Sequence, residues 1–162
     1  MKVPIRYLPN KLTPSDKNKQ FRMLQKSRKL YKKNQYFTRK PVASFVSKPS
    51  NHVSNARRIY NIENVYPTPE LANKTGCTLS ALNKIVEKGE GAYYSSGSRP
   101  NQTAQSWGLA RLASSITSGK SAAVDYNILE HGCNHTKRAF KLAIKARQKY
   151  KYGHSKTKKT NI

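Results

Sequence analysis

The feature of this 162-residue chain that most constrains its fold is the division of its charge into three blocks. Residues 1–62 hold 16 Lys and Arg against one acid, Asp16, and residues 131–162 hold ten against none. Residues 63–130 hold six of each sign. Self-repulsion at a net charge of +25 opposes a compact state unless something negative neutralises it. The pattern predicts a small folded centre whose basic ends bind a polyanion or lie inside an assembly.

The composition predicts a modest core, a reducing environment and no membrane span. Hydrophobic residues make up 36% of the chain, and ten Tyr outnumber four Phe, which is typical of rings at interfaces. Two cysteines, Cys77 and Cys133, do not make a disulfide framework, so we expect free thiols. The chain has no long apolar run, and its first residues do not resemble a signal peptide. We therefore expect a soluble protein of intracellular origin.

The fold class expected is mainly α: a small helical domain of about five to six helices with two basic extensions. Residues 1–12 are expected to form an extended basic arm, because Pro4 and Pro9 oppose a helix. A basic helical region over 13–62 and a helical core over 63–152 follow. Residues 153–162 are expected to be a flexible basic tail.

Capping residues place the individual helices. Thr13-Pro14 and Thr68-Pro69 have the pattern of an N-cap followed by proline, and Gly76, Gly89 and Gly119 suit helix ends. The expected helices run from 13 to about 33, from 51 to 60, from 68 to 76, from 78 or 80 to 89, from 102 to 118 with Asn101 as cap, and from 134 to 150. A linker or short edge strand is expected over 34–50 and a loop over 89–98. Residues 120–130 are ambiguous between helix and strand.

Residues 70–89 have the spacing of a helix-turn-helix. Ala72, Gly76 and Leu82 occupy the small, glycine and apolar positions of that pattern, with Ile85 one turn later. The second helix would then present Ser80, Asn83, Lys84 and Glu87 to a groove. Because local acids offset the local lysines, a hairpin used only for packing is the stronger interpretation.

Residues 91–108 are the most unusual segment, with paired tyrosines, a Ser/Gly stretch and Arg99 before a helix. Two interpretations stay open: an anion held at the helix N-terminus beside Arg99, or an ordered loop whose polar groups satisfy one another. Residues 114–121 contain Gly-Lys-Ser but lack the first glycine of a phosphate loop and follow a helix. His131, Cys133 and His135 do not have a usual zinc spacing.

Acids are few and scattered, so we expect no enzyme, no catalytic residues, no metal and no cofactor. We expect the basic helices to carry the contacts with nucleic acid or with partner proteins. The candidate contact residues are Lys26, Arg28, Lys29, Lys32, Lys33, Arg57, Arg58, Arg99, Lys137, Arg138, Lys141, Lys145 and Arg147.

Residues 33–63, and above all 91–133, resemble an uncharacterised family of short basic proteins encoded by large icosahedral double-stranded DNA viruses, such as those of algae, and by some marine tailed phages. The segment 91–108 is the most specific part of the resemblance, which covers most of residues 7–145. The resemblance implies a viral gene product and a virion component, made in the host cytoplasm or nucleus.

Two functions follow as expectations. The first is a minor capsid protein that docks on other capsid proteins and uses basic flanks to contact acidic protein surfaces, membrane headgroups or the genome. The alternative is a DNA-binding protein, either a genome condenser or a helix-turn-helix regulator, that contacts double-stranded DNA. No small-molecule substrate is expected.

Overall fold

The computed structural model describes residues 2–153 and 158–161, and it is mainly helical. The chain divides into two compact units. The first comprises Met1–Lys48, Glu90–Trp107 and Lys156–Ile162, and the second comprises Pro49–Gly89 and Gly108–Ser155. Within the described residues there are eight α-helices, slightly more than expected, one short 3-10 helix and one two-stranded sheet. None of these helices combines the length and apolar character that a transmembrane span requires.

The first unit is built around helix α1, Pro14–Tyr31. The expected start is confirmed: the side chain of Thr13 accepts a hydrogen bond from the backbone N–H of Asp16, and Pro14 occupies the first turn. Asp16 in turn accepts from Ser44 N–H at 2.8 Å, which ties the irregular segment after the helix to its first turn. The same carboxylate accepts from the Ser44 hydroxyl, and the hydrogen bonds from the hydroxyl and the N–H of Ser44 lower the pKa of Asp16.

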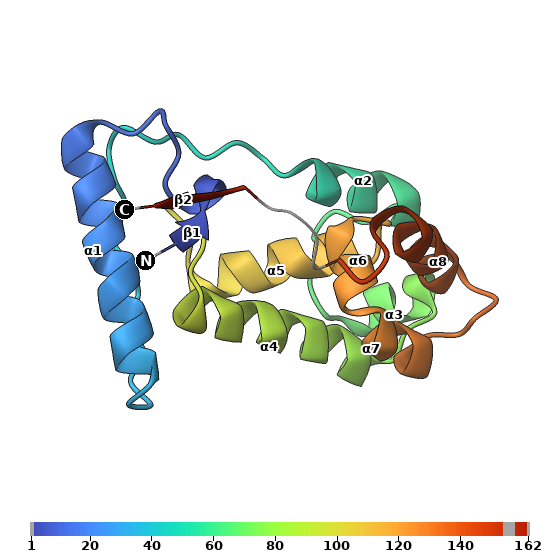
Figure 1. Ribbon diagram of the computed structural model, residues 1–162. Coiled ribbons are helices and arrows are strands. Elements are labelled where there is room, and N and C mark those ends of the chain that lie inside the picture. Colours follow the sequence, from blue (N-terminus) through green and yellow to red (C-terminus); the bar gives the residue numbers. More distant parts are fainter. Residues whose placement is uncertain (1, 154–157, 162) are drawn as a thin grey trace. The chain divides into compact units, whose positions relative to one another are not determined.

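The expected basic arm over 1–12 and tail over 153–162 are not confirmed. Strand β1, Lys2–Pro4, pairs antiparallel with β2, Lys159–Asn161, so the two ends of the chain lie side by side (Figure 1). A 3-10 helix, η1, covers Ile5–Tyr7. Val3 and Leu8 are fully buried, because both pack with Leu24 of α1. Residues 154–157 and 162 of the expected tail lie outside the described residues.

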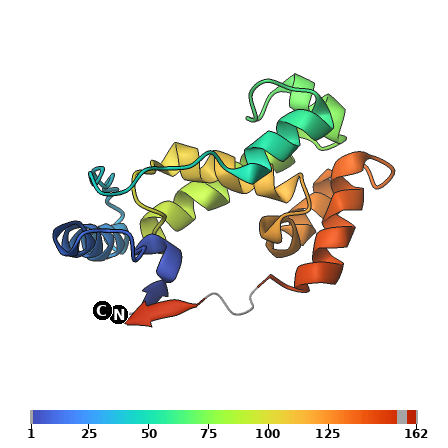
Figure 2. The ribbon, with the colours of Figure 1, turned by 90° about the horizontal axis from the view of Figure 1, so that it is seen from above.

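Five of the described helices lie entirely within the second unit. They are α2 at Asn51–Tyr60, α3 at Pro69–Thr75, α6 at Lys120–Val124, α7 at Tyr126–Gly132 and α8 at Arg138–Tyr150. Residues 120–130, ambiguous in the sequence, are thus helical. Figure 2 shows α6, α7 and α8, in orange to red, packed together. The core of the second unit includes Leu82, Ile85, Leu112, Ile116 and Leu129, all fully buried.

Helices α4, Leu79–Ser95, and α5, Ala104–Ser115, have residues in both units. The expected stop of α4 at Gly89 is wrong, because Gly89 lies against Gly108 of α5, and of the expected loop over 89–98 only residues 96–98 are non-helical. A Cβ on Gly89 would be 2.6 Å from the Gly108 Cα. The glycine allows two helices to approach closely, and helix α4 continues past it.

Asn101 is not the cap of α5, which Thr103 caps by accepting from Ser106 N–H at 3.1 Å. The last helix, α8, begins at Arg138 rather than at Asn134, because Asn134 accepts from both the N–H and the hydroxyl of Thr136 in a local turn. Gly76 does end α3 as expected, with the positive φ of 79° that glycine adopts readily.

The expectation of free thiols is wrong: Cys77 and Cys133 form a disulfide across 56 positions of sequence. The segment before α4 and the end of α7 lie antiparallel there. Thr78 N–H donates to Gly132 O at 2.8 Å, and Asn134 N–H donates to Gly76 O at 2.7 Å. The sequence separation carries no sign of this pairing, which depends on the packing of helices between the two cysteines.

Candidate polyanion-binding surface

Helix α1 presents a basic surface within the first unit. Its buried side is made by Gln20, Met23, Leu24 and Ser27. Lys26, Lys29, Lys32 and Lys33 are exposed, and Arg28 is half-buried. The residues of this unit include 18 Lys and Arg and two acids, Asp16 and Glu90, which gives a net charge of +16. A surface of this sign and density attracts polyanions over long range.

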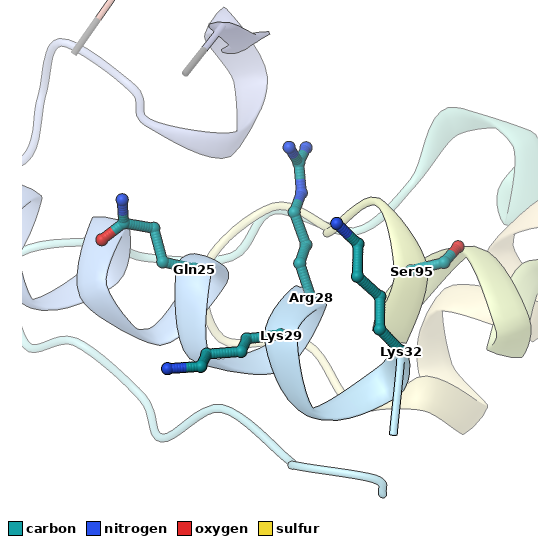
Figure 3. A pocket seen from close by; sticks show the side chains of 5 residues that line it. All are labelled: Gln25, Arg28, Lys29, Lys32 and Ser95. Atoms are coloured by element: carbon teal, nitrogen blue, oxygen red, sulfur yellow. The ribbon is translucent and has the colours of Figure 1, made fainter. Parts of the chain in front are cut away.

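An open pocket of about 470 Å³ lies on this surface, lined by Gln25, Arg28, Lys29, Lys32 and Ser95. Figure 3 shows Arg28 and Lys32 extending to the same side of α1, with Ser95 of α4 beside Lys32. Arg28 is fixed there because its Nε donates to Ser96 O at 2.8 Å. The structure thus brings together three of the thirteen candidate residues, Arg28, Lys29 and Lys32. Lys26 lies apart, over the ring of Phe37 at 4.4 Å.

In the second unit the other candidates lie on two helices. Arg57 and Arg58 are exposed on α2. On α8 the buried side is Ala139, Phe140, Ala143 and Ala146, and most of the residues between them are exposed. Lys137, which precedes this helix, is exposed, as are Arg138, Lys141 and Lys145 on it.

Arg147 differs from these, because it has structural contacts. Its guanidinium lies 4.8 Å from the ring centre of Tyr126 and 4.4 Å from that of Tyr152, and it donates to Ala123 O. Among the described residues, none of the thirteen candidates belongs to an ion pair.

Arg99 lies in the loop between α4 and α5 and is exposed. Partial desolvation lowers its pKa, and the nearby Arg6 acts in the same direction. Polar groups of the surrounding loop are hydrogen-bonded, which agrees with the interpretation of an ordered loop. The Asn101 side chain bonds to the backbones of Val42 and Phe45, and the Ser98 hydroxyl donates to Arg99 O.

Sequence reasoning missed Arg39, a buried cation at the centre of the first unit. Its guanidinium donates to Ser27 Oγ, to Tyr93 O and to Ser98 Oγ at 2.8–2.9 Å, and it stacks 3.8 Å from the ring centre of Tyr93. Burial lowers the pKa of Arg39, and the guanidinium stays charged because its ordinary value is so high. The single arginine in a polar linker gave no signal of burial.

No metal-binding cluster is present among the residues that the structure describes. These residues include no group of three or more His, Cys, Asp and Glu side chains placed to hold a metal ion. Cys133, considered as a ligand beside His131 and His135, is bonded to Cys77. His135 instead stacks on Phe140, with ring centres 4.0 Å apart.

The fold is therefore that of a small, strongly basic, disulfide-bonded helical protein. Residues 4–130 match a family of unknown function, DUF5824, and the chain belongs to this family. No curated protein and no solved structure matches the chain.

Proposed function

We propose that this protein is a virion structural protein, a minor capsid protein that docks on other capsid proteins and binds a polyanion through its basic helices. The observation that carries the proposal is that α1 in the first unit, and α2 and α8 in the second, each present basic side chains outside any ion pair among the described residues. Twelve of the thirteen candidate residues lie on or beside these helices, and none belongs to an ion pair among the described residues. Repulsion among these cations destabilises the folded state, and a neighbour of opposite charge relieves that repulsion.

The disulfide supports the same proposal. Disulfides persist in oxidising surroundings, which include the surfaces of virions, and are rare in the reducing cytosol. A protein made in a host cell and then carried in a released particle meets such surroundings. The resemblance to short basic proteins of large double-stranded DNA viruses and marine phages is in keeping with a virion location.

The buried arm changes how the proposal is tested. Removing residues 1–12 would expose the core around Leu24, so loss of particle incorporation after that deletion would report folding. Surface variants of α8 avoid the problem, because Lys141 and Lys145 are exposed and one turn apart. Replacing both with Gln should reduce incorporation into particles, measured by quantitative mass spectrometry against the major capsid protein.

The matched control replaces Lys141 and Lys145 with Arg, which keeps both charges at the same positions. Incorporation of the Arg variant should equal that of the wild type. Equal incorporation of the Gln variant would show that this face of α8 has no part in assembly. Binding assays with purified components then distinguish three possible partners: an acidic protein surface, membrane headgroups and the genome. The partner is the component that binds the wild type and does not bind the Gln variant.

A second candidate function is sequence-specific DNA binding by the helical hairpin. Helices α3 and α4 flank a turn at Gly76, and Ser80, Asn83, Lys84 and Glu87 are all exposed on α4. This is the exposure that a recognition helix needs. If the hairpin reads bases, Asn83→Ala should lower discrimination among duplex sequences more than it lowers general affinity. Equal loss on every sequence would exclude base reading.

A further inference from the structure

We propose that the first unit carries a binding site for single-stranded nucleic acid, in which the pocket on α1 binds phosphates and an adjoining group of tyrosine rings stacks on bases. The site, here called the strand site, consists of Arg28, Lys32 and Ser95 together with Tyr31, Tyr36 and Tyr94. The strand site shares Arg28 and Lys32 with the basic surface of α1, but it goes beyond the proposed function, because docking on capsid proteins involves neither bases nor a free strand.

The phosphate part of the strand site is the pocket lined by Arg28, Lys32 and Ser95. The hydrogen bond from Arg28 Nε to Ser96 O holds the guanidinium in place before any ligand arrives. Arg28 and Lys32 extend to the same side of the helix (Figure 3). Two cations on one side of the helix, in a pocket that Ser95 also lines, suit the negative charge and acceptor oxygens of a phosphodiester.

The ring part is a group of three tyrosines, one from α1, one from the segment after it and one from α4. The planes of Tyr31 and Tyr94 are within 6° of parallel, and the ring centre of Tyr36 is 5.1 Å from that of Tyr94. Tyr36 is 67% exposed although its ring contacts both of the others. An exposed ring held by its neighbours is a preformed stacking surface.

The phosphate part and the ring part lie next to each other, because one contact between α1 and α4 positions both. Ser27 Oγ donates to Tyr94 O at 3.2 Å, so α1 meets the end of α4 at the residues that carry both the rings and the pocket. Tyr31 follows Arg28 by one helical turn, and Ser95 follows Tyr94 in sequence. Phosphates of one strand and the bases attached to them would therefore reach cations and rings together.

An alternative role for Arg28 and Lys32 is to neutralise the ends of α1 and α4, but this role explains fewer of the observed features. Helix α1 ends at Tyr31 and α4 ends at Ser95, and the hydrogen bond of Arg28 to Ser96 O does satisfy one carbonyl at such an end. It does not account for the exposed ring of Tyr36. Because a duplex hides its base faces in its own stack, rings beside cations favour a single strand over double-stranded DNA.

The test measures binding of fluorescein-labelled oligothymidylate of about 15 nucleotides, a length in the range of single-strand binding sites, by fluorescence anisotropy. A second probe of equal length has the same phosphates but abasic sugars. The wild type should bind oligothymidylate more tightly than the abasic strand. Tyr36→Ala should weaken binding of oligothymidylate about fivefold or more and leave the abasic strand unaffected. Tyr36→Phe, which keeps the ring, should bind both probes as the wild type does.

Lys32→Ala should reduce the slope of log affinity against log salt by about 0.7, the value for one phosphate contact on a single strand. Tyr36→Ala should leave that slope unchanged. Controls are Tyr66→Ala, which removes an exposed tyrosine of the second unit, and Lys11→Ala, which removes an exposed lysine away from the pocket. Equal affinity of the wild type for both probes, or a loss in Tyr66→Ala equal to that in Tyr36→Ala, would overturn the strand site.

Discussion

The carboxylate of Asp125 is fully buried and accepts two hydrogen bonds from the guanidinium of Arg111, each at 2.8 Å. Lys88 Nζ lies 3.1 Å from the same carboxylate, and Ser115 Oγ donates to it at 3.2 Å. One acid thus joins helices α4 and α5 to the turn between α6 and α7. In a chain of net charge +25, this one carboxylate is the shared counter-charge of two cations inside the second unit.

Asp125→Asn should lower the free energy of unfolding by about 3 kcal/mol, because it leaves two cations facing a buried site without a counter-charge. Urea unfolding followed by circular dichroism measures the change. Glu63→Gln is the control, since it removes one acid from an exposed position in the same unit and should change stability by less than about 0.5 kcal/mol. A loss of equal size in both variants would mean that only total charge matters.

The disulfide should contribute about 4 kcal/mol, the loop-closure value for a bridge across 56 positions. Dithiothreitol should therefore lower the melting temperature of the wild type. It should have no effect on a variant that combines Cys77→Ser with Cys133→Ser, and that variant should melt where the reduced wild type does. Melting of the wild type that is indifferent to reductant would contradict the bridge.

Two glycines of α4 should respond to alanine in opposite directions. Gly89→Ala should destabilise the protein by about 1–3 kcal/mol, because the new methyl group would overlap Gly108. Gly91→Ala meets no atom within 4 Å of its Cβ and should raise stability by up to about 1 kcal/mol through helix propensity. Chemical denaturation of both variants checks the pair. A gain in both would show that α4 and α5 do not touch at Gly89.

Lowering the pH should reduce the stability of the second unit, partly through protonation of His52. Burial lowers the pKa of His52 below its ordinary 6.5, so the unfolded chain binds the proton more readily than the folded one. The contribution of His52 is therefore present above pH 6.5 and is lost as the pH falls through its lowered folded-state pKa. The free energy of unfolding should fall less between pH 7.5 and pH 5.5 in His52→Gln than in the wild type. His131→Gln, at an exposed position, is the control.

Local signals in the sequence predicted much of the helical structure. Thr13 and Thr68 cap the helices they were expected to cap, and Gly76 ends α3. Glycine misled the prediction at residue 89, because the same residue type permits both a helix end and a close helix crossing. Only the position of Gly108 in space distinguishes the two.

The features that depend on contacts between distant segments were not visible in the sequence. Val3 is apolar but lies in a basic segment, so its burial against Leu24 could not be inferred from charge. The same holds for the disulfide and for the tyrosine group, whose members come together only when α1 meets the end of α4. The exposure of the basic candidates was easier to predict, since lysines on a helix opposite an apolar side are rarely buried.

The central claim is that this protein is a fixed component of a particle, held by its basic helices. The most direct measurement is its copy number per particle, determined by quantitative mass spectrometry on purified virions before and after the genome is released. We predict a constant ratio to the major capsid protein that is retained in the emptied shells. Absence from purified particles, or loss in proportion to the released DNA, would contradict the claim.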